Sequence, residues 1–480
     1  MQPSPMACRH RPVDGYSSEL LPGKIENREI MTEQTAHARP ASARRRPHVV
    51  VVGGGFAGLS AVKELGKVDV DVTLVDRHTY NTFQPLLYQV ATAGLNPGDV
   101  TYFLRATRMK QRNVSFRQGD VTGVDPVAKV VSFADGGSLD YDYLILGSGA
   151  TTNYFGTPGA EANSMAIYTR AQALQLRDRI FTRLEHAAAA STGDDLTIVV
   201  VGAGPTGVEM AGALAELRND AMSTVYPELD PRRTHIVLLE MADKVLAPFA
   251  PKLREFSARA LRERGVEVRL GTAVKEVRED GVELGNGDFL KAGVVIWATG
   301  VAVPKIVGSW GLPQGRGGRI TVRDDLRVEG YDNVFAAGDV AVTPDPLPQL
   351  SQPALQEGRH AARQIGALLL GRNTEPFRYR DKGTMATIGR RAAIADIKLP
   401  FGKSLRLTGS IAWLIWMFVH IQNLLANRNR LATFINLATK YFSPSRRTNP
   451  IVGDVPVFEQ LTHGKPAPEV PAERTDPAAS

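Results

Sequence analysis

Short runs of branched apolar residues recur along the chain, separated by glycine-rich turns and longer amphipathic stretches. Apolar runs of about four residues, several of which lead into glycine, are typical of strands buried on both faces of a parallel sheet. Such runs stand at 49–52, 72–75, 143–146, 198–201, 236–239, 294–297 and 334–337. Because helical stretches lie between them, the pattern predicts an α/β fold with two parallel-sheet domains, followed by a C-terminal helical segment.

Two of these runs lead into glycine-rich loops of the same form. The loops are Gly53-Gly54-Gly55-Phe56-Ala57-Gly58 and Gly202-Ala203-Gly204-Pro205-Thr206-Gly207. Their glycines let the backbone approach a pyrophosphate, and the helix that follows offers free N–H groups to the anion. One such loop is a weak signal. Two of them predict two Rossmann-like domains holding two dinucleotides, as in an enzyme that moves a hydride from a nicotinamide to a flavin.

An acidic residue ends the second strand of each predicted domain. Asp76 follows the run at 72–75, and Glu240 follows the run at 236–239 after an elongated helix and loop at 217–233. A carboxylate at this point accepts hydrogen bonds from ribose hydroxyls, and its charge repels the 2′-phosphate of NADP. We therefore expect FAD at the first loop and NADH at the second. The alternative for each acid is a solvated side chain at a strand end.

Later strands run into turns that we expect to lie against the cofactors. These turns contain Gly149, Gly300 and Gly338. Asp339 follows the last turn at a helix start, where a carboxylate can bind the ribityl hydroxyls of a flavin. The nicotinamide domain is then inserted within a discontinuous flavin domain. The expected divisions are a disordered leader at 1–46, flavin-domain parts at 47–158 and 302–388, the NADH domain at 159–301, a membrane-associating region at 389–448 and a disordered tail at 449–480.

The cysteine content limits the kinds of redox and metal site that the chain can form. Cys8 is the only cysteine in 480 residues, which excludes a disulfide scaffold, a cysteine-ligated metal cluster and a redox-active cysteine pair. Disulfide reductases and sulfide-oxidising enzymes need cysteines beside the flavin, so electrons are expected to leave the flavin directly for an acceptor. No apolar stretch in 1–46 is long enough for a signal peptide, which favours a catalytic part on the cytoplasmic side.

Positive charge is concentrated near the C-terminus. Residues 401–450 hold seven Lys and Arg and no Asp or Glu, and the whole chain has a net charge of +7. The apolar run at 411–419 lies in the same segment and carries two of the four tryptophans. This combination predicts a helix lying on an anionic membrane surface, with a second at about 431–442. A buried core or dimer helix and a true span are the alternatives, although a span needs about 20 apolar residues.

Together these motifs resemble those of the type II NADH dehydrogenases, single-subunit flavin enzymes that reduce quinone without pumping protons. The resemblance covers about residues 47–445. Its most specific part is Gln352-Pro353-Ala354-Leu355-Gln356, which is similar to the family's Gln-x-Ala-x-Gln quinone-side motif, with Ser351 where alanine is usual. The run at 411–419 lacks the lysine of some bacterial members. The sequence Asn427-Arg428-Asn429-Arg430 looks more like the actinobacterial branch.

The resemblance implies the roles of several residues. Gln352 and Gln356, on one helix face, would orient the quinone carbonyls, and Glu209 would meet the nicotinamide amide and the flavin edge. Glu357, His360 or water would supply the quinone protons. The alternatives without a catalytic role are a solvent-exposed helix face for the two glutamines and, for Glu209, an acid that stabilises the N-terminus of its helix through the helix dipole. The implied protein is a homodimer without a metal, peripheral on the cytoplasmic face of the cell membrane, and it passes electrons to menaquinone in the bilayer.

Two other functions are weighed against this one. A soluble NADH-dependent reductase could pass electrons to a protein acceptor such as a ferredoxin, but it has no need of the lipid-like run at 411–419. A flavoprotein that binds nucleic acid would place its basic residues against phosphates. Here they flank a continuous apolar run instead. We therefore expect no nucleic-acid partner.

Overall fold

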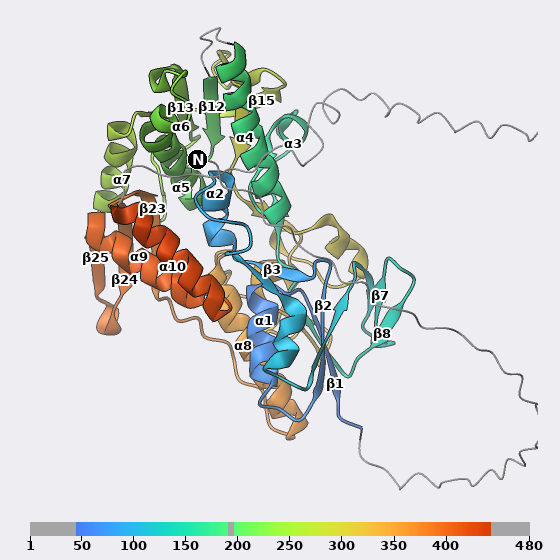
Figure 1. Ribbon diagram of the computed structural model, residues 1–480. Coiled ribbons are helices and arrows are strands. Elements are labelled where there is room, and N and C mark those ends of the chain that lie inside the picture. The colour runs from blue at the N-terminus through green and yellow to red at the C-terminus, as the bar shows by residue number, and fades with distance from the viewer. Residues whose placement is uncertain (1–44, 191–195, 443–480) are drawn as a thin grey trace, which may run out of the picture. The chain divides into compact units, whose positions relative to one another are not determined.

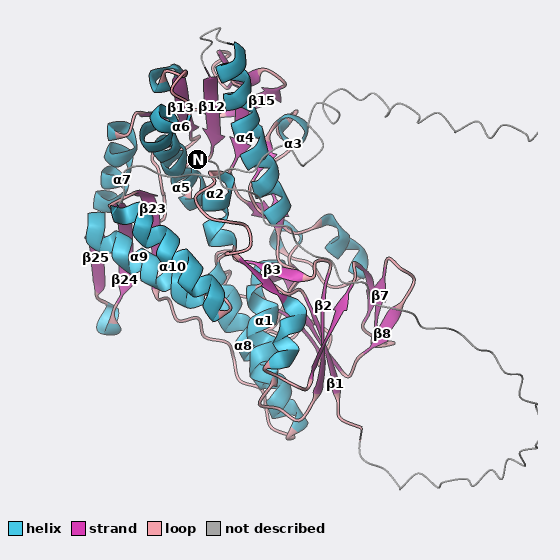
Figure 2. Ribbon diagram, viewed as in Figure 1, coloured by secondary structure: helices cyan, strands magenta, loops and turns pink. Residues whose placement is uncertain are grey.

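The computed structural model describes residues 45–190 and 196–442 (Figure 1). The predicted tail at 449–480 and nearly all of the predicted leader at 1–46 lie outside the described residues. All seven apolar runs are strands, as the pattern predicts, and Figure 2 shows helices alternating with them. The segment at 217–233 differs in detail from the expected elongated helix, because α5 continues into a π-helical turn over Leu217–Met222.

The first sheet has five parallel strands in the order β21-β9-β1-β2-β5. Its strands are β1 (His48–Val52), β2 (Asp71–Asp76), β5 (Val114–Gln118), β9 (Tyr143–Leu146) and β21 (Val334–Ala336). Helices α1 (Phe56–Leu65) and α8 (Ser351–Leu369) pack against each other beside this sheet (Figure 1). They approach so closely that a Cβ on Gly358 would lie 2.0 Å from the carbonyl oxygen of Ala57. A segment near residue 334 thus completes a sheet begun at residue 48.

The second sheet is also parallel, in the order β11-β18-β12-β13-β14. Its strands are β11 (Met165–Ala166), β12 (Leu196–Val201), β13 (Thr234–Leu239), β14 (Val266–Arg269) and β18 (Val294–Trp297). The helices of this part of the chain are α3 (Ala160–Asn163), α4 (Arg170–Ala190), α5 (Pro205–Glu216), α6 (Ser223–Val225) and α7 (Pro251–Glu263). Helix α5 is buried over most of its length, because it packs on this sheet and also on the C-terminal region.

The C-terminal region consists of an antiparallel sheet and two helices. Its elements are β23 (Gly383–Gly389), β24 (Ala392–Lys398), β25 (Ser404–Thr408), α9 (Gly409–Asn423) and α10 (Asn427–Phe442). Helix α9 packs on β24, and α5 lies so close to β23 that a Cβ on Gly212 would be 2.1 Å from the carbonyl oxygen of Ile388. The Asn429 amide donates to the carbonyl of Thr101 at 2.6 Å. The C-terminal region is therefore joined to both parallel-sheet domains.

Short elements complete the fold. The remaining strands are β3 (Tyr80–Thr82), β4 (Thr101–Phe103), β6 (Val121–Asp125), β7 (Val130–Phe133), β8 (Ser138–Asp140), β10 (Thr151–Thr152), β15 (Val274–Arg278), β16 (Gly281–Leu284), β17 (Phe289–Lys291), β19 (Val301–Ala302), β20 (Ile320–Thr321) and β22 (Ala341–Val342). Helix α2 (Leu87–Ala91) packs on α4 and α5. Two of these short strands, β10 and β19, pair with each other where the chain passes into and out of the second sheet.

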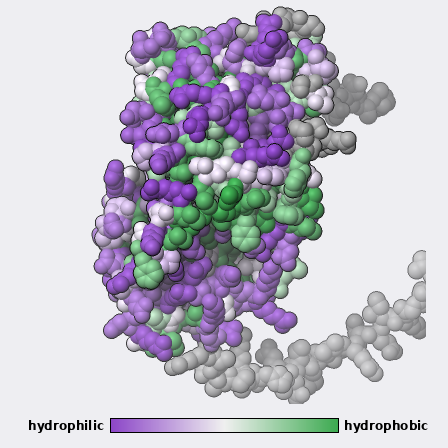
Figure 3. All heavy atoms as spheres, turned by 90° about the vertical axis from the view of Figure 1, so that its left-hand side faces the viewer, coloured by the Kyte–Doolittle hydropathy of each residue, from purple (hydrophilic) through white to green (hydrophobic). Residues whose placement is uncertain are grey.

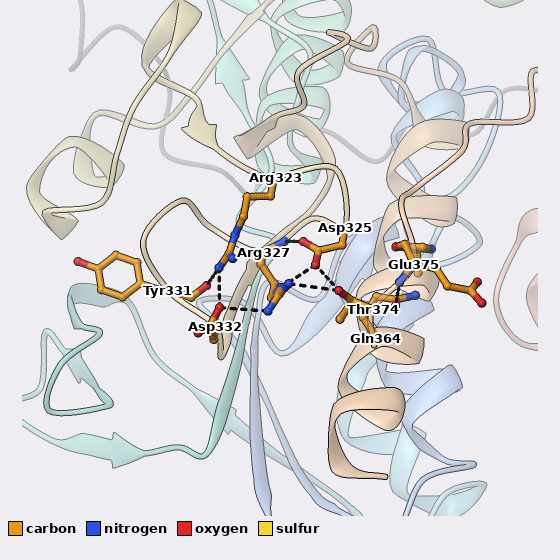
Figure 4. Close-up of polar contacts among 9 residues, drawn as sticks. Arg323, Asp325, Arg327, Tyr331, Asp332, Gln364, Thr374 and Glu375 are labelled. Atoms are coloured by element: carbon orange, nitrogen blue, oxygen red, sulfur yellow. Dashed lines mark hydrogen bonds and ion pairs between the residues drawn. The ribbon is translucent and has the colours of Figure 1, made fainter. Parts of the chain in front are cut away.

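A polar network fixes the chain after α8 (Figure 4). Asp325 accepts hydrogen bonds from Arg327 at 2.6 Å and from the Thr374 hydroxyl at 2.6 Å. Arg327 also contacts Asp332 at 3.0 Å. Although burial opposes ionisation, these hydrogen bonds and the guanidinium keep the pKa of Asp325 below its usual value. The network ties the loop around Asp325 to the segment that leads from α8 toward β23.

Candidate dinucleotide and acceptor sites

The first glycine loop joins β1 to α1 and has no room for side chains at two of its glycines. Gly53 has a φ of +102°, and a Cβ there would lie 2.1 Å from the carbonyl oxygen of Gly147. A Cβ on Gly58 would lie 1.8 Å from the carbonyl oxygen of Gly53. By contrast, a Cβ on Gly55 would meet nothing within 4 Å. The loop is closed on its protein side and open at the N-terminus of the helix, which suits a pyrophosphate.

The second loop, between β12 and α5, repeats this geometry. Gly202 has a φ of +98°, and a Cβ there would lie 2.7 Å from the carbonyl oxygen of Ala298. A Cβ on Gly207 would lie 1.8 Å from the carbonyl oxygen of Gly202, whereas one on Gly204 would meet nothing within 4 Å. Both loops therefore have the form that binds a dinucleotide.

The two predicted acids stabilise these loops through hydrogen bonds to the loop backbone. Asp76 accepts a hydrogen bond from the backbone N–H of Gly54 at 2.6 Å, and Glu240 accepts one from Ala203 at 2.6 Å. Burial raises the pKa of Asp76, and the backbone N–H groups of His78 and Gly54 oppose that rise. Each carboxylate has lone pairs left, so it can bind the loop and a ribose hydroxyl together.

Buried polar atoms beside the first loop fit a bound flavin nucleotide. Within the described residues, the Ser148 hydroxyl and the Gln84 side-chain oxygen are buried and have no hydrogen-bond partner. Burial raises the pKa of Asp339, which lies near the guanidinium of Arg319. The Arg319 Nε is likewise buried and unpaired among the described residues. Polar groups left unpaired in the protein alone are expected where a polar cofactor binds, and sequence reasoning missed all of these except Asp339.

A cavity of about 580 Å³ opens along the second loop. Its lining includes Gly202, Gly204, Glu240 and Gly300. Tyr168, which the sequence did not single out, also lines the cavity and accepts a hydrogen bond from the backbone N–H of Ala150 at 3.3 Å. Ala150 follows Gly149 in the turn after β9, so Tyr168 lies where the turn of the first sheet meets the cavity of the second. A nicotinamide nucleotide fits this cavity and would approach a flavin there.

Glu209 lies two residues beyond the second loop and is 9% exposed. Its carboxyl accepts a hydrogen bond from the backbone N–H of Thr387 on β23 at 3.3 Å. Burial raises its pKa to about 8, while the Thr387 N–H and the nearby Trp416 indole favour the charged form. Glu209 is therefore a buried acid that holds a proton at neutral pH, where α5 meets the C-terminal region.

Aromatic rings from three distant segments gather next to Glu209. Trp416 stacks on His420 with ring centroids 4.3 Å apart, and His420 meets Phe83 edge-to-face at 6.1 Å. Phe83 in turn meets Phe56 of the first loop at 5.8 Å. The Trp416 indole nitrogen is buried and has no partner of hydrogen-bond geometry in the described chain. This cluster links the first loop to α9, and the sequence analysis did not predict it.

The residues expected on the acceptor side divide into two groups. Both ends of the Gln356 amide bind the backbone of Arg380, at 3.0 and 3.1 Å. Glu357 is buried and accepts a hydrogen bond from Gly338, and burial raises its pKa to about 7. His360 binds the carbonyl of Glu375 at 2.9 Å. No hydrogen bond from the Gln352 amide to the described chain is present, so this side chain is available to a ligand.

The helices at the C-terminus expose one apolar face each. Figure 3 shows hydrophobic residues gathered in a band on the side of the molecule that carries this region. The exposed residues are Ile411 (62%), Leu414 (46%) and Phe418 (62%) on α9, and Leu431 (61%), Phe434 (47%), Ile435 (51%) and Phe442 (78%) on α10. We expected the two tryptophans of α9 to enter the membrane, and this was wrong. Trp413 and Trp416 are 3% and 1% exposed because they fill the core shared with α5.

No helix in the two described ranges is long and apolar enough to cross a membrane. We give the outward faces of α9 and α10 the name apolar face, defined by the seven exposed residues above.

Comparisons with known proteins agree with this architecture. The family model described as pyridine nucleotide-disulphide oxidoreductase matches residues 47–358, and the NDH2 C-terminal domain matches residues 382–444. The type II NADH:quinone oxidoreductase Ndh of Mycobacterium tuberculosis is 36% identical over 92% of this chain and 97% of its own length. The type II NADH:quinone oxidoreductase of Staphylococcus aureus is 32% identical over 75% of this chain and 91% of its own length.

Solved structures show the same fold. The structure of NDH2 from Plasmodium falciparum in complex with NADH has a TM-score of 0.76 and 21% identity, covering 84% of this chain and 99% of that one. The sulfide:quinone oxidoreductase of Aquifex aeolicus has a TM-score of 0.66 and 19% identity, covering 83% of this chain and 96% of that one. These comparisons confirm the predicted fold class, and the sequence relatives confirm the predicted FAD and NADH cofactors. The chain belongs to the type II NADH:quinone oxidoreductases.

Proposed function

We propose that this protein is a membrane-associated enzyme that oxidises NADH and reduces menaquinone without pumping protons. The observation that carries the proposal is the position of Glu209. The helix that begins at the nicotinamide loop leads directly to this buried acid, which lies against β23 and near α9. The outer side of α9 forms part of the apolar face. The nicotinamide site and a lipid-facing acceptor site would then share α5.

When bound, FAD supplies a two-electron carrier between NADH and the quinone. Gly53, Gly55, Phe56, Ala57 and Gly58 would hold its pyrophosphate. The other residues of the flavin site would be Asp76 at the ribose, Gly149 and Gly338 in adjoining turns, and Asp339 at the ribityl chain. The open space at Gly55 supports this assignment.

Gly202, Gly204 and Gly207 would hold the pyrophosphate of NADH, with Gly300 along the same cavity. Glu240 would bind the ribose hydroxyls and oppose the 2′-phosphate of NADP. Because reaction needs close stacking of two rings, the main task of these residues is to position NADH and exclude water.

On the acceptor side, Gln352 would act on the quinone. Glu209, which the resemblance placed at the nicotinamide amide and the flavin edge, is here proposed to act on the quinone as well. The Gln352 amide would orient a quinone carbonyl. Glu209 holds a proton at neutral pH, because burial raises its pKa to about 8, and it would donate this proton as the hydroxyl forms. Gln356 was expected to bind quinone as well. Its two hydrogen bonds to Arg380 favour a supporting role in which it holds the chain that leads to β23. The contacts of Glu357 and His360 likewise favour structural roles over proton supply.

The apolar face would rest on the cytoplasmic surface of the cell membrane, where Lys403, Arg406, Arg428 and Arg430 can meet anionic lipid headgroups. Menaquinone is proposed on the actinobacterial resemblance, and a homodimer remains our expectation. The division of the chain into a discontinuous flavin domain, an inserted NADH domain and a membrane-associating region is also proposed. The strand order of the first sheet supports the discontinuous flavin domain.

Anaerobic mixing of the purified protein with NADH, followed by menadione, tests the proposal. We expect NADH to bleach the visible flavin absorbance and menadione to restore it within one turnover. NADPH should bleach it much more slowly. Failure of menadione to restore the absorbance, together with restoration by a ferredoxin, would favour a soluble reductase and overturn the proposal.

A further inference from the structure

His420 lies on α9, and one nitrogen of its ring has no hydrogen bond to the described chain. Its ring lies between two aromatic rings, with centroids 4.3 Å from Trp416 and 6.1 Å from Phe83. Trp416 is 1% exposed and Phe83 is 6% exposed, whereas His420 as a whole residue keeps some accessible surface. The imidazole is therefore held in place by two aromatic rings, on a residue that is not fully closed off from its surroundings.

The hydrogen-bonding state of this ring is fixed by its neighbour. The Nδ1 atom of His420 lies 2.7 Å from the carbonyl oxygen of Trp416. A carbonyl only accepts hydrogen bonds, so Nδ1 carries the hydrogen and Nε2 is the acceptor of the neutral ring. Burial lowers the pKa of His420 to about 4, so the ring is neutral at physiological pH. No hydrogen bond joins Nε2 to the described part of the chain.

The groups around His420 complement this acceptor. Glu209 lies near Trp416 and holds a proton at neutral pH. The Trp416 indole N–H is buried beside the Glu209 carboxyl and favours the charged form of that acid. Phe83 connects the ring to Phe56 in the first glycine loop. The surroundings of His420 therefore include rings that connect it to the first glycine loop and, through Trp416, the buried acid Glu209.

Quinone reduction changes which groups can bind here. The oxidised quinone has two carbonyl oxygens, which only accept hydrogen bonds, so neither can bind the Nε2 lone pair. Addition of two electrons and two protons converts these oxygens into hydroxyl groups, which can donate. We propose that the Nε2 of His420 accepts a hydrogen bond from a hydroxyl of the hydroquinone product. This inference rests on the proposed function and names a further residue of the same site.

An interaction that forms only as the hydroxyl forms acts on the rate rather than on substrate binding. His420 should therefore raise the kcat of quinone reduction and leave the KM for quinone unchanged. It should also have no effect on the oxidation of NADH, because His420 does not line the cavity along the second loop, where NADH would bind.

Two ligands that cannot accept electrons from the reduced flavin separate the effect of the hydroxyl from that of the rest of the molecule. The phenol 4-methoxy-1-naphthol has one donating hydroxyl, and 1,4-dimethoxynaphthalene has nearly the same shape without it. Isothermal titration of each ligand into the flavin-loaded enzyme should show that the phenol binds about fivefold more tightly, as expected for one neutral hydrogen bond. In His420→Phe, which keeps an aromatic ring against Trp416, the ratio should fall to about one.

His360→Phe is the matched control. His360 also packs edge-on against a phenylalanine, with ring centroids 5.3 Å apart, but its Nε2 is already bound to the carbonyl of Glu375. This variant should keep the fivefold ratio. His420→Phe should also reduce kcat about fivefold at an unchanged KM for menadione, with the same rate of flavin bleaching by NADH.

An unchanged ratio in a His420→Phe protein that retains its flavin would overturn the assignment of His420 and leave the proposed function intact. Failure of the wild type to bind either ligand, together with failure to reduce menadione, would overturn the proposed function itself. A raised KM without a change in kcat would show that His420 binds the oxidised quinone, and this would also contradict the inference.

Discussion

The two glycine loops make nearly the same backbone contacts, yet the helices that follow them differ in function. In both loops the first glycine receives the same kind of support from the neighbouring strand: Gly53 N–H donates to Val75 at 2.7 Å and Gly202 N–H donates to Leu239 at 2.8 Å. In both, the acid braces the next residue at 2.6 Å. Backbone geometry and one carboxylate therefore build the same loop twice in one chain.

The difference begins two residues after the last glycine of each loop. There the first helix has Ser60 and the second has Glu209, each 9% exposed. The Ser60 hydroxyl donates to the carbonyl of Leu355 at 2.6 Å and fastens α1 to α8. Glu209 instead turns its carboxyl toward β23 and α9. The comparison indicates that both loops serve to bind a dinucleotide. The equivalent position on the helix that follows can instead hold a residue for packing, as Ser60 does, or a residue for proton transfer, as we propose for Glu209.

The largest effect is expected when a side chain is added to a glycine on the closed side of a loop. Gly207→Ala would place a Cβ 1.8 Å from the carbonyl oxygen of Gly202. The backbone would have to shift at a cost of about 3 kcal/mol, which corresponds to about 100-fold weaker NADH binding. Titration with NADH, followed by flavin absorbance, measures this change. Gly58→Ala should instead reduce the FAD content of the purified protein.

Gly204→Ala is the control for the second loop, because its Cβ would meet no protein atom within 4 Å. It should weaken NADH binding while leaving the melting temperature unchanged. If Gly207→Ala and Gly204→Ala behaved alike, the closed and open sides of the loop would be wrongly assigned.

The outer face of α9 offers the next test, because Glu209 lies on the inner side of this region. Phe418→Ser removes an aromatic side chain that is 62% exposed, and burial of such a side chain is worth about 2 kcal/mol. Binding to anionic vesicles, measured by co-sedimentation, should weaken about 30-fold. Reduction of water-soluble menadione should not change.

Truncation before Lys403 would not serve this purpose. It would remove Trp413 and Trp416, which belong to the core, so loss of membrane binding would not distinguish a damaged fold from a missing apolar face. Vesicle binding by Phe418→Ser equal to that of the wild type would count against contact between lipid and α9.

A smaller effect is expected from the acids of the two loops. Glu240→Gln removes the charge that opposes the 2′-phosphate of NADP but keeps a side chain that can contact Ala203. The ratio of kcat/KM for NADH to that for NADPH should fall about tenfold. Asp76→Asn should leave this ratio unchanged, since Asp76 belongs to the other loop. Equal use of NADH and NADPH by the wild type would refute the role of Glu240.

The smallest effect distinguishes the two glutamines of α8. Gln352→Ala should slow restoration of the flavin absorbance by menadione about fivefold, as loss of one neutral hydrogen bond predicts. Gln356→Ala should lower the melting temperature instead, because its amide holds the backbone of Arg380. Stopped-flow absorbance and thermal unfolding of both variants provide the measurement. A slower quinone step in Gln356→Ala, without loss of stability, would reverse the two assignments.

The sequence was most informative where structure depends on neighbours along the chain. Seven strands and both glycine loops follow from local periodicity and from the backbone conformations that glycine permits. The aromatic cluster was missed because Phe56, Phe83 and Trp416 come from segments more than 300 residues apart at the extremes, and no local pattern records their meeting. The orientation of α9 was missed for a related reason. An unbroken apolar run has no polar side to show which face is buried, and only packing against β24 turns Trp413 and Trp416 inward.

The pH dependence of the quinone half-reaction tests the role of Glu209 most directly. Flavin would first be reduced by NADH without oxygen and then mixed with menadione in a stopped-flow instrument from pH 6 to pH 10. Because burial raises the pKa of Glu209 to about 8, the carboxyl is protonated below that pH and loses its proton above it. The wild-type rate should therefore fall as pH rises through about 8. Glu209→Gln should be about 100-fold slower, as for loss of a general acid, and independent of pH in this range. A variant with the wild-type rate and the same decline near pH 8 would contradict the account.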